Sequence, residues 1–187
     1  MTVQTFDFGF LASYPALMRS RLMEFHRGIP LVLFLWLSAC GGREREESVL
    51  LKPVPEENID HDAVADAVED ARHALTYFTA ELEAPRPGST YAVKMRFEDN
   101  GEFELMWINE VSFDGAQFSG VLDSSPRVVT NVRRGDRGTV ARDEVRDWLI
   151  TDADGSLRGG YTIRAMLPSM DPEQRAAFTP LLRPLPD

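Results

Sequence analysis

The longest helical pattern of apolar and polar positions runs from Asp60 to Glu83. Its apolar residues recur at steps of three and four, which places them on one stripe of a helix: Val64, Val68, Ala71, Leu75, Phe78 and Leu82. Asp60 is suited to the N-cap position, and the prolines of the following APRPG segment cannot continue a helix. The pattern therefore predicts one amphipathic helix whose acidic residues lie on a solvated face.

From Thr90 onward the period of the pattern changes from 3.6 to 2, which is typical of half-buried strands. Asn100-Gly101 is the preferred dipeptide of a type I′ hairpin, and Asp114-Gly115 marks a second turn. These signals predict an antiparallel meander. Its strands are expected from Thr90 to the first turn and over residues 102–113, 116–123, 137–141, 147–151 and 161–167, while residues 128–132 could pair weakly.

The end of the chain carries a helix start signal. Asp171-Pro172-Glu173 places an N-cap residue, a first-turn proline and an acid in order, which predicts a short helix to Phe178. The remaining residues are rich in proline and predict a loose tail. We therefore expect a folded domain over residues 59–168, followed by a short helix and a loose tail over residues 169–187.

The most apolar run of the chain lies near its start, over residues 29–39. A bilayer core of ~30 Å needs about 20 apolar residues in a helix, so this run is too short to span it. A buried helix would have to begin at Gly28 and Pro30, and its residues offer no solvent face. A secretory signal peptide fits better, because a positively charged region precedes the run: Arg19, Arg21 and Arg27.

Leu37-Ser38-Ala39-Cys40 resembles the lipobox of bacterial lipoproteins. The resemblance implies that the Cys40 thiol receives lipid, with acyl chains such as palmitate, and becomes the new N-terminus. Residues 1–39 would then be a signal peptide whose true start lies near Met18 or Met23, and residues 40–58 a flexible tether. Gly41 in place of aspartate implies an outer-membrane anchor facing the periplasm if the source is Gram-negative. An uncleaved anchor and a buried segment remain open as alternatives.

Composition narrows the classes of function. The formal net charge is −10, which argues against nucleic acid as a partner, since backbone phosphates are bound by Lys and Arg. Cys40 is the only cysteine, so lipidation leaves no disulfide, cysteine nucleophile or thiolate metal site. His61 and His73 are twelve residues apart, which is ~18 Å along a helix, too far to share an ion. We therefore expect no metal and no cofactor.

The segment VARDEVRDWLITDADGSLRGGYTIRAML, residues 140–167, resembles the YegJ-type family called domain of unknown function 2314. The resemblance is carried by Asp147-Trp148 and by the residues from Gly160 to Arg164, with support from YAVKMRFED, MWINEV and FSGVLDSSP. It covers about residues 62–167. It implies an α+β fold, in which one N-terminal amphipathic helix packs on a strongly bent antiparallel sheet of five to six strands, with a short C-terminal helix. The family has no established activity, so the resemblance implies no catalytic residue.

Four residues are candidates for ligand binding: Trp107, Trp148, Tyr161 and Arg164. Large aromatic residues on alternating strand positions normally build the core. A sheet that bends around a groove could instead expose one or two of them as a recognition surface. Arg164 would then anchor an acidic ligand or a peptide carboxylate.

Two hypotheses follow, beside the simpler option that the domain only supports a larger assembly. The first is a lipid-anchored cell-envelope protein whose domain is a non-catalytic binding module for a protein, a peptide or an envelope component. The alternative is a hydrolase-like enzyme that uses Glu144 or Asp147 with Arg164, although Arg142 and Arg146 nearby favour ordinary surface ion pairs. A deep polar pocket in which the three side chains converge would favour the enzyme. A shallow aromatic groove or an exposed strand edge would favour the binding module.

Overall fold

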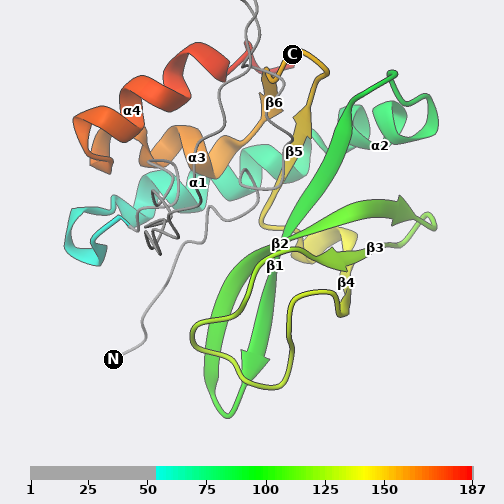
Figure 1. The fold of residues 1–187 in the computed structure, drawn as a ribbon, viewed down its shortest axis with the longest axis horizontal. Coiled ribbons are helices and arrows are strands. Elements are labelled where there is room, and N and C mark those ends of the chain that lie inside the picture. The colour runs from blue at the N-terminus through cyan, green and yellow to red at the C-terminus, as the bar shows by residue number, and fades with distance from the viewer. Residues whose placement is uncertain (1–53, 187) are drawn as a thin grey trace, which may run out of the picture.

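The computed structural model describes residues 54–186, in which helices pack on one antiparallel sheet (Figure 1). The predicted signal peptide, Cys40 and most of the predicted tether lie outside the described residues. Within residues 54–186, no helix combines the length and the apolar character needed to cross a membrane.

The predicted N-terminal helix forms as two consecutive helices, α1 (His61–His73) and α2 (Leu75–Glu83), which follow a short 3-10 turn, η3 (Glu56–Asn58). Asp60 is the N-cap of α1, as predicted, because its side chain accepts a hydrogen bond of 3.0 Å from the backbone N–H of Ala63. The helical course is interrupted at Ala74. Each half buries its own part of the apolar stripe: α1 buries Val64, Ala67, Val68 and Ala71, and α2 buries Leu75 and Phe78.

The sheet has six strands in the order β4-β3-β2-β1-β5-β6, and every neighbouring pair is antiparallel. The hairpin between β1 and β2 turns at Asn100 and Gly101, whose φ angles of 51° and 85° suit the predicted type I′ turn. The alternating pattern therefore predicted most of the sheet. The strands are β1 (Thr90–Asp99), β2 (Glu102–Phe113), β3 (Gln117–Leu122), β4 (Arg137–Ala141), β5 (Asp147–Thr151) and β6 (Leu157–Gly159).

The sheet is bent, so that β4 approaches the face of β1 although two strands, β3 and β2, lie between them in the sheet order. A bulge in β2 accompanies the bend, where the register with β3 shifts and Glu110 adopts a φ of 52°. A Cβ atom placed on Gly138 of β4 would lie 3.0 Å from Met95 Sδ and 3.1 Å from Phe97 Cζ. Gly138 therefore allows a close approach that a side chain would hinder.

The prediction of a last strand over residues 161–167 is wrong. Tyr161–Met166 forms the helix α3, followed by the 3-10 turn η5 (Leu167–Ser169), and the last strand is β6. Two consecutive glycines with positive φ separate β6 from α3: Gly159 at 82° and Gly160 at 65°. The chain therefore turns sharply where the alternating pattern had predicted an extended course.

A buried carboxylate from another strand caps α3. Asp147 of β5 accepts hydrogen bonds from the backbone N–H groups of Tyr161 at 3.1 Å and Thr162 at 2.9 Å. It also accepts a hydrogen bond of 2.6 Å from the Thr162 hydroxyl and one of 2.8 Å from the backbone N–H of Trp148. This long-range contact satisfies the free N–H groups of the first helical turn, so it favours a helix over the strand that the local pattern predicted.

Residues 128–132, which were expected to pair weakly, form no strand. Carboxylates on the β1–β2 hairpin hold this loop instead. The buried Glu104 accepts hydrogen bonds from the backbone N–H groups of Arg127 and Val128, at 2.9 and 3.0 Å. Asp99 accepts a hydrogen bond of 2.9 Å from the backbone N–H of Thr130 and one of 2.6 Å from the Thr130 hydroxyl. Side-chain acceptors therefore satisfy backbone donors that a strand partner would otherwise satisfy.

The C-terminal helix is confirmed as α4 (Pro172–Phe178), capped by Asp171 through the backbone N–H groups of Glu173 and Gln174 and followed by the turn η6 (Thr179–Leu181). The expectation of a loose tail does not hold for the next two residues. Leu182 forms a parallel bridge with Leu157 of β6, and Arg183 N donates to Leu157 O at 2.9 Å. The tail therefore covers the outer edge of β6.

Successive residues of the central strands are buried on opposite faces of the sheet. In β1, Val93 belongs to a cluster with Phe78 of α2, whereas Ala92 belongs to a second cluster with Ile163 of α3 and Phe178 of α4. Helices therefore contribute to the core on both faces. This agrees with the predicted α+β fold class.

Candidate functional site

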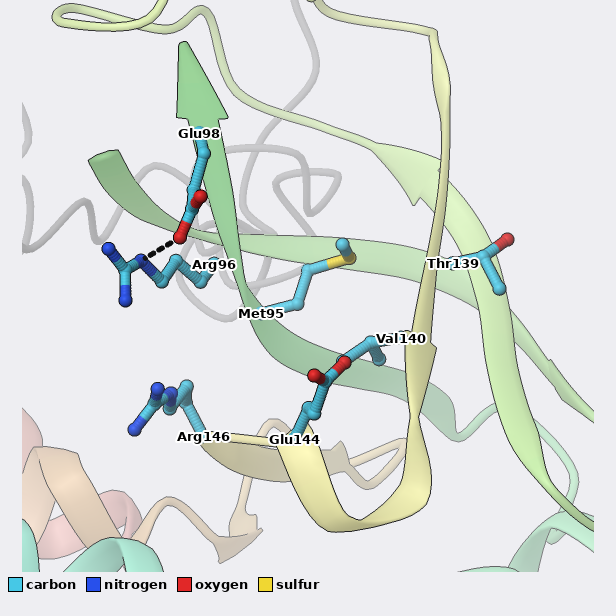
Figure 2. Close-up of a pocket in the computed structure, with 7 residues that line it drawn as sticks. All are labelled: Met95, Arg96, Glu98, Thr139, Val140, Glu144 and Arg146. Atoms are coloured by element: carbon cyan, nitrogen blue, oxygen red, sulfur yellow. Dashed lines mark ion pairs between the residues drawn. The ribbon is translucent and has the colours of Figure 1, made fainter. Parts of the chain in front are cut away.

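A groove of roughly 330 Å³ lies between β1 and the edge strand β4, beside the 3-10 turn η4 (Arg142–Glu144) (Figure 2). Arg96 and Glu98 lie on the β1 side, where an ion pair of 2.8 Å joins them. Glu144 projects from η4 toward the middle of the view, and Arg146 follows η4 at the lower side. The lining residues are Met95, Arg96, Glu98, Thr139, Val140, Glu144 and Arg146.

The β4 strand contributes an open sheet edge to this groove. Just beyond the end of β4, Arg142 N donates to Ala116 O at 3.0 Å, which identifies the hydrogen-bonded pairs of the β3–β4 ladder. Such pairs recur at every second residue, so Val140 and Gly138 direct their peptide groups toward β3. Thr139 between them directs its N–H and C=O away from β3. Among the described strands, none pairs with this side of β4.

Arg146 brings a buried, unsatisfied donor to the groove. Its Nε atom is buried and has no hydrogen-bond partner in the described part of the chain. Burial lowers the pKa of Arg146, the nearby Arg72 and Arg96 lower it further, and Glu144 opposes them. A buried cationic donor without an acceptor is energetically costly, so this position favours an incoming anion.

The two neighbouring guanidinium groups have acceptors of their own. Arg96 Nε pairs with Glu98 Oε1 at 2.8 Å, and Arg72 Nη1 pairs with Glu69 Oε1 at 2.7 Å. Arg146, in contrast, is held through its backbone, whose N–H donates to Lys94 O at 2.9 Å. The groove therefore combines one partly neutralised arginine, Arg96, with Arg146, whose Nε lacks a partner in the described part of the chain; Arg72 is close to Arg146 but does not line the groove.

The three aromatic candidates lie in the core. Trp148 is fully buried, and Trp107 and Tyr161 are only 3% and 6% exposed. Trp148 donates from Nε1 to Ala71 O at 2.9 Å and stacks on Phe78 at a centroid distance of 5.2 Å. The bent sheet therefore does not expose these residues as a recognition surface, and they stabilise the packing of the helices on the sheet.

The three residues of the hydrolase alternative make separate contacts within residues 54–186 and do not meet in the groove. Glu144 is exposed and lines the groove, whereas Asp147 is buried. Arg164 donates from Nε to Gly159 O at 2.9 Å and from Nη2 to the backbone oxygen of Arg183. Arg164 therefore connects α3 to the end of β6 and to the C-terminal tail.

Asp147 has the environment of a structural acceptor. Burial raises the pKa of its carboxyl group, while the hydrogen bond from Thr162 and the charge of Lys94 oppose that shift. Lys94 is itself only 1% exposed and is the cross-strand partner of Asp147. Asp147 is sealed from any substrate. Asp147-Trp148 and the residues from Gly160 to Thr162 therefore have a structural explanation, because they join β5 to the start of α3.

Apart from Glu144, the sequence did not single out as candidates the residues that line the groove. Arg146 was expected to form ordinary surface pairs, and neither Thr139 nor Arg96 was a candidate. The period-2 pattern located both strands, but the approach of β4 to β1 depends on the bend of the sheet, which leaves no local signal. Within residues 54–186, no group of three or more His, Cys, Asp and Glu residues is placed to hold a metal ion.

Comparison with known proteins matches residues 61–181 to a family described as "Uncharacterized protein conserved in bacteria (DUF2314)". The chain is 32% identical over 115 residues to the uncharacterized protein YegJ of Escherichia coli (strain K12), covering 62% of this chain and 74% of that protein. It is 37% identical over 118 residues to a Neisseria meningitidis serogroup B protein provisionally named an ankyrin repeat protein, covering 58% of this chain and 46% of that protein. No solved structure matches significantly.

Proposed function

The chain belongs to the DUF2314 family of uncharacterized bacterial proteins, and from that premise we propose that it is a lipid-anchored cell-envelope protein whose domain binds an extended segment of a partner protein along β4. The role is non-catalytic. The observation that carries the proposal is the open edge of β4 beside the groove.

The lipid anchor is supported by the lipobox-like residues that end at Cys40. A short apolar run after a positively charged region is typical of a secretory signal. Acyl chains on Cys40 would hold the domain at a membrane surface, since each buried methylene contributes ~0.8 kcal/mol. The anchor lies in the outer membrane and the domain in the periplasm if the source is Gram-negative, because Gly41 rather than aspartate follows the cysteine.

Binding along β4 is supported by the contrast between the two edges of the sheet. The β6 edge is covered by Leu182 and Arg183 of the C-terminal tail. The β4 edge has no such cover from the described residues and presents the N–H and C=O of Thr139. An added strand gains main-chain hydrogen bonds from such an edge, and neighbouring pockets select its side chains.

A non-catalytic role is supported by the burial and the contacts of the two candidate carboxylates, Asp147 and Glu144. Asp147 is sealed in the core by its contacts with Thr162 and Lys94. Glu144 is exposed and lines the groove, whereas Arg164 donates to the backbone of Gly159 and Arg183 and does not line this groove. The hydrolase alternative requires one of these carboxylates to act beside Arg164 on one substrate, and the described contacts of Asp147 and Arg164 do not support that arrangement.

Affinity capture of the full-length protein from its native envelope tests the proposal. Thr139→Pro removes the outward N–H without removing a β3–β4 hydrogen bond, and proline is tolerated on edge strands. Thr139→Val is the matched control, because it keeps the N–H and the strand propensity. We expect the wild type and Thr139→Val to recover the same partner, and Thr139→Pro to lose it while its circular dichroism stays unchanged. Recovery of no partner in any growth condition would count against the proposal.

A further inference from the structure

We infer that the segment bound along β4 carries an acidic side chain, and that Arg146 in the groove binds its carboxylate. This inference rests on the proposed function and specifies the chemistry of the partner. It uses two features that lie in one groove: the open edge at Thr139 and the buried Nε donor of Arg146.

The first step is the unmet hydrogen bond of Arg146. Buried side-chain donors in folded proteins nearly always have an acceptor, and Arg146 Nε has none among the described residues, so this guanidinium group can gain hydrogen bonds from a ligand in the groove that it lines. Arg146 follows η4, and its backbone is anchored to Lys94 O at 2.9 Å. The base of the side chain is therefore fixed beside the groove.

The second step is the choice of an anion as that partner. A guanidinium carries only donors, so its acceptor is an oxygen, and a carboxylate can accept two parallel hydrogen bonds from it. The repulsion of Arg146 by the charges of Arg72 and Arg96 outweighs its attraction by those of Glu144 and Glu69. The surrounding charges therefore disfavour the charged guanidinium of Arg146 while it has no partner. A carboxylate would relieve both the missing hydrogen bond and this repulsion.

The third step excludes an acceptor already present. Glu144 lines the same groove, but no ion pair joins it to Arg146 within the described residues. Glu98, the other acid of the groove, is paired with Arg96 at 2.8 Å. Neither acid of the groove is therefore paired with Arg146 among the described residues, which leaves its guanidinium group available to a carboxylate that enters the groove.

The peptide origin of the carboxylate follows from the edge strand. Side chains of an added strand alternate between the two faces of the sheet, so every second one faces the same way. Arg146 and Thr139 line one groove, so a strand held at Thr139 can present one side chain to Arg146. A free oxyanion would meet Arg146 but would make no use of the strand edge.

Selection from a random peptide library on the full-length protein, purified in detergent, tests the inference. We expect the wild type to select extended peptides with Glu or Asp at one fixed position. Changing that acid to its amide should weaken binding about tenfold or more, as for other desolvated charge pairs. Arg146→Gln should bind the acid and amide forms equally, and Arg146→Lys should keep part of the preference. The exposed Arg175→Gln on α4 is the control and should select as the wild type does.

The outcomes distinguish failure of the inference about Arg146 from failure of the proposed binding along β4. Peptides selected without an acidic position, or an acidic preference that persists in Arg146→Gln, would overturn the inference and leave binding at β4 intact. Millimolar inorganic phosphate could also displace the acidic peptide equally well from the wild type and from Thr139→Pro. This result would indicate a site for free anions and would also overturn the inference. Selection of no peptide by the wild type would remove both the inference and the proposed function. If Arg146→Gln has an altered circular dichroism, Arg146→Lys decides the test, and an acidic preference that is undiminished in Arg146→Lys would overturn the inference.

Discussion

The carboxylate of Asp147 and the backbone and hydroxyl of Thr162 are joined by two hydrogen bonds, of 2.9 and 2.6 Å, across fifteen residues of sequence. Both residues are buried, at 0% and 1% exposure. The contact attaches the N-terminus of α3 to β5. It therefore explains why a segment with a strand-like pattern forms a helix.

Replacing Asp147 with alanine should lower the free energy of unfolding by ~3–5 kcal/mol, because the N–H groups of Tyr161 and Thr162 lose their acceptor and Lys94 loses its counter-charge in the core. Urea denaturation of the full-length protein measures this change. Asp143→Ala, an exposed residue on η4, is the control and should change the value by less than about 0.5 kcal/mol. A stable Asp147→Ala protein would contradict the structural role.

Gly159→Ala should be strongly destabilising, by about 3 kcal/mol. Gly159 has a φ of 82°, and a Cβ atom there would lie 2.5 Å from the ring and the carbonyl oxygen of Trp148. Gly101→Ala is the matched control, because its φ is 85° but nothing lies within 4 Å of the added atom. Thermal unfolding of both variants separates the steric cost from the backbone cost. Equal losses would show that the contact with Trp148 relaxes freely.

Acid should weaken the fold partly through Asp152. A hydrogen bond from Arg158 lowers the pKa of Asp152 below its ordinary 3.8, and Ser89 adds to the shift. Since the folded-state pKa is depressed, the stabilisation is present above about pH 4 and is lost as the pH falls through the folded-state value. Asp152→Asn should therefore show a smaller loss of stability than the wild type between about pH 5 and pH 3.

Urea denaturation at the two pH values measures that difference. Asp66→Asn, an exposed change on α1, is the control and should leave the acid dependence as in the wild type. An acid dependence that is the same in Asp152→Asn and the wild type would mean that the Arg158 contact contributes no pH-dependent stability.

Cys40→Ser should abolish lipid attachment. The expected result is release of the protein from the membrane fraction or accumulation of an uncleaved precursor, because serine cannot form the thioether to the lipid. Fractionation followed by intact-mass measurement reports both outcomes. Ser48→Ala in the predicted tether is the control and should stay with the membrane. Unchanged mass and membrane association of Cys40→Ser would exclude the lipoprotein assignment.

The sequence predicted those elements whose signals are local. Asn100-Gly101 fixed the first hairpin, Asp60 and Asp171 fixed the starts of two helices, and the period-2 pattern located β1, β2, β4 and β5. Each of these signals depends on residues that are neighbours in the chain. The boundaries of these elements were therefore accessible without knowledge of the tertiary fold.

The errors share a different origin. The helix α3 depends on Asp147 of β5, and the loop after β3 depends on Glu104 and Asp99 of the first hairpin. The groove depends on the bend that brings β4 over β1 and on Arg146, which follows η4 and lines the groove beside them. These are long-range contacts of single polar side chains, which no periodicity records.

Residue-resolved hydrogen exchange along β4 tests the central claim most directly, with the strongest peptide from the library selection as the probe. Added as a strand, the peptide should protect the amides that point away from β3, at Arg137, Thr139 and Ala141. The amides of Gly138 and Val140 should change little, because they already face β3. This alternating protection is the predicted result. Uniform protection, or protection confined to residues outside β4 and its groove, would contradict binding at this edge.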